Sequence, residues 1–548
     1  METSQKIRNY IDNNTSEIFD SEIKDEKELV FFYHLSEMRK SLYNWYDFRN
    51  DGKLLEVGAG FGALTGLFCE KCASVTALAE SEYQADAIRV RHSKYDNLSV
   101  YGLDSENAEA DFEDNSDREL MSGVIDGDAL LEALDRLAGE KFDYIVLTGI
   151  LERISSGREE LLMRIKGLLA PKGKLLIATE NRYGMKYLCG EREDVSGIPF
   201  AGLRNGGVTR QGLISLVCEA GFSKHKFFYP LPDYRFPLQV YTDEYLPQKN
   251  IGERVLFYHD GAESLVADEK LLYSDIIDNG VFPFVANSFL IECMADGSAE
   301  DLSDVSFVAL TTDRGPEAAL TTVIKRDAVE KKPLYSEGLK SIQEVLRNVQ
   351  EMKERGLSVI DHEFDGSVIR MPYIEAPALM DYMRTISDDR EKISDIFELL
   401  WTMILQSSDE VPANENRIKE YGELGDEVNW GPILKKVYIE MMPMNCFYID
   451  GQISFFDQEF AREYFPAKYA MYRAVFYTYV NIPEIEKVLP AAEIKAKYGF
   501  EDKLWNAFMA EESRFVEAIR RLSDNAFFYD RLRVDEAKMQ DNAKRLML

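Results

Sequence analysis

The region from Lys53 to Phe228 constrains the fold most strongly, because short apolar segments alternate there with helical segments. The apolar segments are "KLLEVG", "SVTALAE", "LSVYGL", "FDYIVLTG" and "GKLLIATE". Strands that alternate with helices form a parallel sheet with helices on both faces. We therefore predict an α/β domain with a mostly parallel sheet over residues 49–250, preceded by a helical cap over residues 1–48.

A glycine-rich turn follows the first of these strands, in "LLEVGAGFGALTG". Glycine lets the backbone turn sharply and approach a ligand at the end of a strand. Gly58, Gly60 and Ala63 satisfy the GxGxx(G/A) pattern of dinucleotide-binding folds. Glu56 and Gly62, together with the same two glycines, satisfy the E-x-G-x-G-x-G pattern of methyltransferases. The turn by itself does not choose between the two cofactors.

An acid at the end of the second strand also points to a nucleoside. Glu80, in "VTALAES", stands where an acid accepts both ribose hydroxyls, and it serves NAD and S-adenosylmethionine equally. Two later segments, "FDYIVLTGILERI" and "GLLAPKGKLLIATEN", resemble the fourth- and fifth-strand motifs of class I S-adenosylmethionine-dependent methyltransferases. This resemblance covers residues 50–228 and implies a Rossmann-like domain. It also implies that Gly58 and Gly60 cradle the methionine portion, that Glu80 holds the ribose, and that Asp104 lies near the adenine.

The methyl acceptor is expected to offer an oxygen. The chain has no Asp/Asn-Pro-Pro-Tyr loop after the fourth strand, which disfavours nucleobase amines. The segment "ENRYGMKYLCGEREDVSGIPFAG" follows the fifth strand, where an acceptor loop would lie. Its polar residues suit a sugar or a phosphate; they are Arg182, Tyr183, Lys186, Glu191, Arg192 and Asp194.

The pattern changes after residue 250. "ANSFLIEC", "SFVALTTD" and "LTTVIKRD" are successive strands without helices between them, which predicts an antiparallel sheet. Further on, "VYIEMMPMNCFYIDGQISFFDQEF" places Glu440 five residues before Asn445, followed by a hairpin and Asp457. This order resembles the catalytic loop and metal-binding strand of kinase-like folds, particularly the aminoglycoside phosphotransferases.

The resemblance implies a site for ATP and Mg²⁺ in an α+β kinase-like domain. Glu440 would meet the acceptor hydroxyl, Asn445 and Asp457 would bind Mg²⁺, and Lys325 in "TTVIKRD" would contact ATP phosphates. "RMPYIEAP" resembles the hinge between lobes. Two features depart from the pattern: Glu440 replaces the usual Asp, and no glycine-rich loop is visible. The candidate helix partners of Lys325 are Glu337 and Glu344.

The expected organisation is a cap at 1–48, a methyltransferase domain at 49–250, a kinase-like domain at 260–500 and a helical tail at 501–548. This order is similar to bifunctional enzymes that methylate and phosphorylate the end of bacterial surface polysaccharides. It implies a glycan or sugar-phosphate acceptor and a glycosyltransferase complex as partner. Two alternatives stay open: a C-terminal half that is a non-catalytic binding and assembly module, and a nicotinamide-dependent oxidoreductase.

Composition narrows the partners and the compartment. The formal net charge of -33 disfavours broad contact with nucleic acid or anionic membranes. No run of 18 apolar residues is present and the acidic N-terminus is unlike a leader, so a cytoplasmic protein is expected. The six cysteines and five histidines show no metal-ligand spacing.

Overall fold

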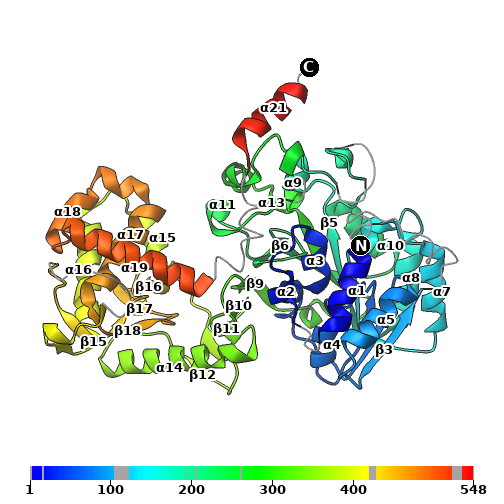
Figure 1. The fold of residues 1–548 in the computed structure, drawn as a ribbon, viewed down its shortest axis with the longest axis horizontal. Helices are drawn as coiled ribbons and strands as arrows, with labels where there is room; N and C mark the ends of the chain where they lie inside the picture. Colours follow the sequence, from blue (N-terminus) through cyan, green and yellow to red (C-terminus); the bar gives the residue numbers. More distant parts are fainter. Residues whose placement is uncertain are drawn as a thin grey trace. The chain divides into compact units, whose positions relative to one another are not determined.

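The chain divides into two compact units in the computed structural model (Figure 1). The structure describes residues 3–14, 18–103, 123–193, 196–203, 207–259, 262–418, 428–520 and 534–546. Unit 1 comprises Met1–Thr312, Val323–Arg326 and Leu522–Leu548, and unit 2 comprises Asp313–Thr322 and Asp327–Arg521. The strand β10 (Leu320–Lys325) spans this division.

Unit 1 is built on a mixed sheet. Its strands are β1 (Lys53–Val57), β2 (Ser74–Ala79), β3 (Leu98–Gly102), β4 (Phe142–Thr148), β5 (Leu169–Glu180), β6 (Lys224–Leu231), β7 (Gln239–Thr242), β8 (Ser288–Met294) and β9 (Val305–Leu310). Their order in space is β9-β7-β6-β8-β5-β4-β1-β2-β3. The pairs β3–β2, β2–β1, β1–β4 and β4–β5 are parallel, which confirms the predicted parallel sheet.

Helices cover both faces of this sheet (Figure 1). They are α4 (Thr65–Lys71), α5 (Glu82–Arg91), α7 (Gly127–Arg136), α8 (Arg158–Leu168), α9 (Met185–Leu188), α10 (Arg210–Glu219), α11 (Ile251–Arg254), α12 (Tyr273–Asp278) and α13 (Phe282–Val285). On one face, Leu134 and Ile165 of α7 and α8 share a core with Leu78. On the other, Ala77 packs against Ile88 of α5. This alternation along β2 is what a strand buried on both faces requires.

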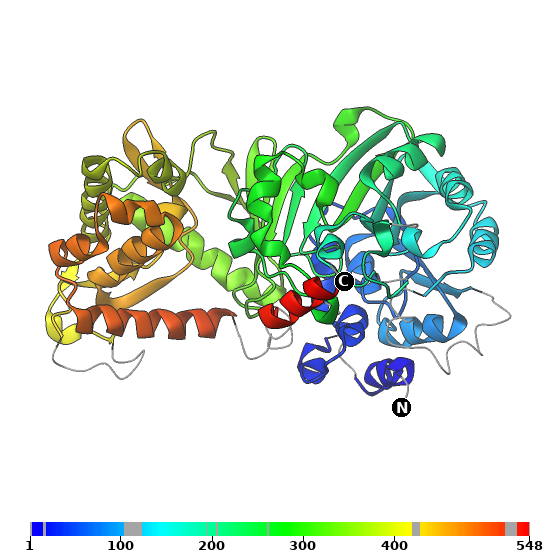
Figure 2. The ribbon, with the colours of Figure 1, turned by 90° about the horizontal axis from the view of Figure 1, so that it is seen from above.

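The N-terminal helices α1 (Thr3–Asn13), α2 (Asp20–Ile23) and α3 (Leu29–Leu35) lie side by side in unit 1 (Figure 2). Their apolar side chains, such as Phe31, pack with Phe61 of the glycine-rich turn and Phe236. Arg91 secures this contact because its guanidinium donates hydrogen bonds to the carbonyl oxygens of His34 and Phe61, at 2.7 and 3.0 Å. The helical N-terminal segment thus packs against the glycine-rich turn.

Strand β8 belongs to the sheet of unit 1, and this differs from the expected boundary near residue 260. It pairs antiparallel with β5 on one side and β6 on the other, and all seven of its residues are buried. The next strand, β9, pairs with β7. The run "SFLIECM" is buried on both faces of the strand, including Glu292, which pairs with Lys174 at 2.7 Å, so it fills a central position rather than an edge.

Unit 2 combines short strands with a helical core. Its strands are β11 (Ala328–Pro333), β12 (Glu363–Phe364), β13 (Ile369–Pro372), β14 (Glu410–Val411), β15 (Ile433–Tyr438), β16 (Cys446–Ile449), β17 (Gln452–Phe455) and β18 (Ala461–Pro466). Its helices are α14 (Leu339–Glu354), α15 (Leu379–Thr385), α16 (Arg390–Gln406), α17 (Ala467–Asn481), α18 (Ala491–Lys497) and α19 (Asp502–Arg520). Phe397, Tyr472 and Phe508 join α16, α17 and α19 in one core.

The expected helical tail at 501–548 separates into two parts. Helix α19 packs into the core of unit 2 through Leu504 and Phe508. Helix α21 (Glu536–Leu546) lies in unit 1, where Asn542 Nδ2 donates to the carbonyl oxygens of Glu263 and Leu265 at 2.7 and 2.9 Å. Within the described ranges, no helix is both long and apolar enough to cross a membrane.

Candidate active site

The crevice of unit 1 lies where the strand order reverses. The chain runs from β1 outward to β2 and β3, and then returns to place β4 and β5 on the other side of β1. In open α/β sheets, ligands bind outside the carboxyl ends of the strands at such a switch point. The segments that follow β1, β2 and β4 therefore form the candidate site.

The glycine-rich turn adopts backbone conformations that favour glycine. Gly58, Gly60 and Gly62 have φ angles of 78°, 52° and 81°. A Cβ on Gly58 would overlap the Cδ1 atom of Ile150, which follows β4. The N–H groups of Gly58 and Ala59 both donate to the Leu78 carbonyl oxygen at 2.9 Å. The turn is thereby held between the ends of β2 and β4, as the sequence pattern predicts for a ligand-binding loop.

A small pocket lies beside this turn. It is lined by Val57, Gly58, Leu78, Ala79, Glu80, Leu103, Ile125, Leu130 and Ile150. Within the described part of the chain, Glu80 is the one ionisable residue in this lining. Among the described residues, apolar side chains beside a carboxylate at the end of β2 have the chemistry of a nucleoside site, in which apolar groups contact the base and the carboxylate accepts ribose hydroxyls.

Arg153 holds the Glu80 carboxylate from outside the pocket lining. Its Nη1 and Nη2 atoms lie 2.7 and 2.8 Å from Oε1 and Oε2 of Glu80. Sequence reasoning did not single out Arg153, although it stands in the quoted motif "FDYIVLTGILERI". Its role depends on a contact between residues 73 positions apart, which no local pattern reveals.

The remaining predicted cofactor residues have different settings. Glu56 is buried below the turn and accepts a hydrogen bond from Thr65 Oγ1 at 2.7 Å. Burial raises the pKa of Glu56 to about 8, so the group is largely neutral at pH 7. It supports the turn and does not line the pocket. Asp104 lies outside the described residues.

Polar groups converge at the carboxyl end of β4. A Cβ on Gly149 would lie 2.6 Å from the Tyr234 hydroxyl and 3.3 Å from the Tyr33 hydroxyl. Glu152 is oriented from β5, because Thr179 Oγ1 donates to its Oε2 at 2.8 Å. The Tyr234 hydroxyl lies 3.3 Å from Oε1 of the same carboxylate. Glu152, Tyr33 and Tyr234 thus place polar groups beside the residues that follow β4.

Four buried charged residues at the ends of β5 and β6 form one network. Lys186 Nζ lies 3.2 Å from Glu180 Oε1 and 3.1 Å from Asp233 Oδ2. Arg235 Nη2 lies 3.1 Å from the same Glu180 oxygen. Burial raises the pKa of Glu180 to about 7, while Lys186 and Arg235 oppose this rise. Lys186, predicted as an acceptor contact, is therefore engaged by two carboxylates.

The other predicted acceptor-loop residues do not converge on one point. Tyr183 stacks on Phe284 with ring centroids 5.3 Å apart, and Arg182 donates to the Gly202 carbonyl oxygen. Glu191 accepts from His259 Nδ1 at 2.6 Å in a buried pair. Arg192 is exposed, and Asp194 lies outside the described residues.

In unit 2 the structure brings Asp457 to a lysine other than the predicted one. Lys331, on β11, is buried and contacts the carboxylates of both Asp457 and Glu459. Arg314 Nη1 lies 2.6 Å from Glu459 Oε2. These cations hold the pKa of Glu459 below its usual value, although burial of the carboxylate acts in the opposite direction. Asp457 itself has a φ of 54°, an uncommon conformation for a residue other than glycine.

Lys325 has a different partner: its Nζ lies 2.7 Å from Asp47 Oδ2 in unit 1. Strands β10 and β11 are separated by two residues, and sequence position alone did not distinguish their lysines. Of the two candidate helix partners, Glu344 pairs with Arg347 at 3.1 Å, and Glu337 accepts from the Ser336 hydroxyl.

Glu440 and Asn445 both precede the hairpin formed by β16 and β17. Glu440 Oε2 accepts the backbone N–H groups of Glu459 and Phe460 at 2.6 and 3.0 Å. Burial, together with the nearby Glu459 charge, raises the pKa of Glu440 to about 7. The Asn445 carbonyl oxygen accepts from the Phe456 N–H at 3.0 Å, which joins the loop to the residue before Asp457. The carboxylate of Glu440 is thus engaged in holding the segment after Asp457.

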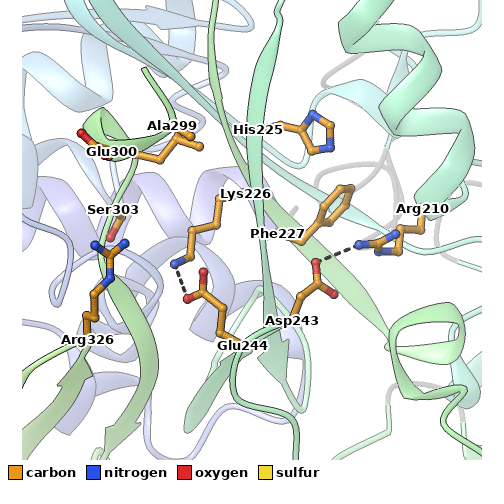
Figure 3. A pocket seen from close by; sticks show the side chains of 11 residues that line it. Arg210, His225, Lys226, Phe227, Asp243, Glu244, Ala299, Glu300, Ser303 and Arg326 are labelled. Atoms are coloured by element: carbon orange, nitrogen blue, oxygen red, sulfur yellow. Dashed lines mark hydrogen bonds and ion pairs between the residues drawn. The ribbon is translucent and has the colours of Figure 1, made fainter. Parts of the chain in front are cut away.

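A further pocket in unit 1 lies at the amino end of β6 (Figure 3). There Arg210 points toward Asp243, with Nη2 and Oδ2 2.8 Å apart, and Lys226 points toward Glu244, also at 2.8 Å. This pocket stands away from the carboxyl ends of β1 and β4, and these two cations are paired. We therefore place the candidate site at the switch point.

Among the described residues, no group of three side chains has the composition of a metal site.

Comparisons with known proteins give structural likenesses only. No family model and no curated protein matches the chain. A carbon methyltransferase of CurJ matches with a TM-score of 0.24 at 14% identity, covering 45% of this chain and 49% of that chain. Phosphoethanolamine N-methyltransferase 1 of Haemonchus contortus, solved with phosphoethanolamine and S-adenosylhomocysteine, matches at 0.21 and 12%, covering 36% of each chain. A SAM-dependent methyltransferase from Archaeoglobus fulgidus matches at 0.28 and 16%, covering 50% of this chain and 97% of that chain.

Proposed function

We propose that unit 1 is an S-adenosylmethionine-dependent methyltransferase. The observation that carries this proposal is the turn after β1, where three glycines have positive φ and Gly58 lies against Ile150 after β4. Beside it is a pocket whose lining, among the described residues, includes one carboxylate, Glu80. Glu80 would accept the ribose hydroxyls, and the apolar walls would enclose the adenine.

The position of β8 favours this proposal over the oxidoreductase alternative. The dinucleotide fold has a parallel sheet in the order 3-2-1-4-5-6. In this chain an antiparallel strand, β8, separates β5 from β6. The sheet therefore departs from the dinucleotide fold, which weighs against the oxidoreductase alternative.

The acceptor is proposed to be a hydroxyl of a glycan or phosphorylated sugar. When bound, the cofactor supplies an activated methyl group, so the protein mainly has to align the acceptor and take up its proton. Glu152 and Tyr234 lie at the carboxyl end of β4 with the geometry for that role. The pairing of Lys186 with two carboxylates favours a hydroxyl over a phosphate as the group nearest these residues. A cytoplasmic setting and a partner glycosyltransferase belong to the same proposal.

Calorimetric titration of the full chain with S-adenosylhomocysteine tests the cofactor. We expect saturable binding to the wild type, and binding at least 10-fold weaker to Glu80→Ala, because charge-assisted hydrogen bonds to the ribose are lost. Glu82→Ala is the matched control, since Glu82 is a nearby carboxylate that pairs with Arg89 and does not line the pocket. Binding of NAD without binding of S-adenosylhomocysteine would overturn the proposal.

For unit 2 we propose a kinase-like site that binds ATP with Mg²⁺. The observation that favours it is the contact of the buried Lys331 with the partly exposed Asp457, since phosphotransferases of this kind combine a strand lysine with a metal-binding aspartate. Asn445 would share the Mg²⁺ with Asp457, and Lys331 would take the phosphate contact expected of Lys325. Glu440 would act by holding the loop, because its Oε2 atom accepts two backbone N–H groups.

Titration with ATP and Mg²⁺ separates this proposal from the non-catalytic module. We expect Lys331→Ala and Asp457→Ala to abolish binding, and Lys325→Ala to leave it unchanged because Lys325 pairs with Asp47. Magnesium-dependent ATP consumption that Asp457→Ala removes would indicate a kinase. Binding without consumption would indicate a nucleotide-binding module, and no binding to the wild type would leave unit 2 as an assembly module.

A further inference from the structure

The pocket at the amino end of β6 is a cavity of about 370 Å³ (Figure 3). It lies where β7 ends: residues 228–231 of β6 pair with β7, whereas, among the described strands, residues 224–227 pair with β8 alone. Every described residue of its lining belongs to unit 1, and Arg326 comes from the segment Val323–Arg326. Its volume is within the range of about 300–1,000 Å³ that is usual for ligand sites.

The charged groups in the lining of this cavity balance one another. Three cations and three carboxylates are present among its described residues; they are Arg210, Lys226, Arg326, Asp243, Glu244 and Glu300. Arg210 pairs with Asp243 and Lys226 with Glu244, each at 2.8 Å. Arg326 and Glu300 are exposed and form no ion pair within the described ranges. A ligand with a net charge of either sign meets as many like as opposite charges, so charge alone does not retain it.

The same lining suits an uncharged ligand with many hydroxyl groups. A hydroxyl both donates and accepts, so one hydroxyl can donate to Glu244 and accept from Lys226 within the same ion pair. Ser303 and His225 add uncharged polar groups, because burial, together with the nearby Arg210 charge, lowers the pKa of His225 and keeps it neutral at pH 7. The rest of the described lining is apolar and offers contacts for the C–H groups of a sugar ring; it comprises Phe227, Ala299 and Leu302.

We propose that this cavity is a second ligand site of unit 1, which binds neutral sugar units of a glycan. The inference takes its ligand class from the glycan acceptor of the proposed function and does not depend on the cofactor. The cavity is far from the switch point, because His225 aligns through Cys293 with Leu175 of β5, and Glu180 lies five residues farther along that strand, about 16 Å at the usual rise. A single sugar cannot reach both places, so the proposed ligand is an oligosaccharide that the cavity holds away from its methylated end.

A glycan array, followed by calorimetric titration of the full chain, tests this site. The probes are neutral oligosaccharides of glucose, galactose and mannose, beside oligosaccharides that contain uronic acid or glucosamine. We expect the wild type to bind at least one neutral oligosaccharide. We expect Arg326→Ala to bind it at least 10-fold more weakly, because an exposed guanidinium of the lining no longer donates to the sugar hydroxyls.

Arg164→Ala is the matched control, because Arg164 is an exposed arginine of unit 1 that pairs with Asp135 and does not line the cavity. It should bind like the wild type. The inference is overturned by a wild type that binds no neutral oligosaccharide or only the charged ones. An Arg326→Ala protein with wild-type affinity also overturns it, since the glycan then binds elsewhere. Failure to bind S-adenosylhomocysteine would instead overturn the proposed function of unit 1 and leave this inference standing.

Discussion

At the scale of single residues, the glycine at position 58 is decisive because both its conformation and its surroundings exclude a side chain. Its φ is 78°, and a Cβ there would overlap Ile150. We expect Gly58→Ala to lower the free energy of unfolding of unit 1 by about 2 kcal/mol or more, from backbone strain and overpacking together. Binding of S-adenosylhomocysteine should weaken with it. Urea unfolding and calorimetric titration measure the two effects.

Gly157 provides the control for this prediction. It has nearly the same φ, 79°, but among the described residues, its chain neighbours aside, no heavy atom lies within 4 Å of the position of a Cβ. We therefore expect Gly157→Ala to lower the free energy of unfolding by about 1 kcal/mol, from backbone strain alone, and to leave cofactor binding unchanged. Equal effects of the two substitutions would contradict the assigned role of the close approach to Ile150.

A second residue-scale prediction concerns His259, which lies between two glutamates. Its Nδ1 is 2.6 Å from Glu191 Oε2, and its Nε2 is 3.8 Å from Glu269 Oε1. These carboxylates raise the pKa of His259 from 6.5 to about 9, although burial of the imidazole acts in the opposite direction. A raised folded-state pKa means that the stabilisation is complete below pH 6.5 and is lost as the pH rises through 9.

We expect the wild type to have a higher free energy of unfolding than His259→Gln, and this difference to be about 3 kcal/mol larger at pH 6 than at pH 10. By linkage, this is the free energy that corresponds to the shift in the pKa of His259. Urea unfolding of both proteins across this range measures the difference. His225→Gln is the control, because burial lowers the pKa of that histidine. A pH-independent difference for His259→Gln would show that the imidazole acts only by packing.

At the scale of elements, helix α21 contributes to unit 1 although it follows unit 2 in the chain. Asn542 donates to two carbonyl oxygens of residues 263 and 265, and Met539 packs against the core of unit 1. We expect Asn542→Ala to lower the protection of α21 amides by about 1 kcal/mol, measured by hydrogen exchange. Lys544→Ala, on the same helix and exposed, should leave this protection nearly unchanged. Equal protection in both variants would contradict the docking of α21.

At the scale of the whole molecule, the two units have separate hydrophobic cores. We therefore expect two calorimetric unfolding transitions in the full chain. S-adenosylhomocysteine at 100 times its dissociation constant should stabilise one by about 2.7 kcal/mol, and ATP with Mg²⁺ should stabilise the other. A single transition that both ligands stabilise alike would contradict this division.

Local patterns were sufficient for the sheet and for the cofactor turn. The strand–helix alternation predicted the parallel strands, because a buried strand and an amphipathic helix each leave a mark within a few residues. The turn at Gly58, Gly60 and Gly62 also followed, since a tight turn at a strand end requires glycine. The cofactor roles of these glycines and of Glu80 stay predictions. Asp104 lies outside the described residues, so its assignment stays a prediction.

Only the tertiary structure decided which distant residues meet. An apolar run such as 288–294 reveals that a strand is buried, but not that β8 enters between β5 and β6. Likewise, the pairing of Glu80 with Arg153, and of Asp457 with Lys331 rather than Lys325, depends on strands brought together over long sequence separations. Sequence periodicity records which face of an element is apolar, whereas the partner of that face is set by packing of the whole chain.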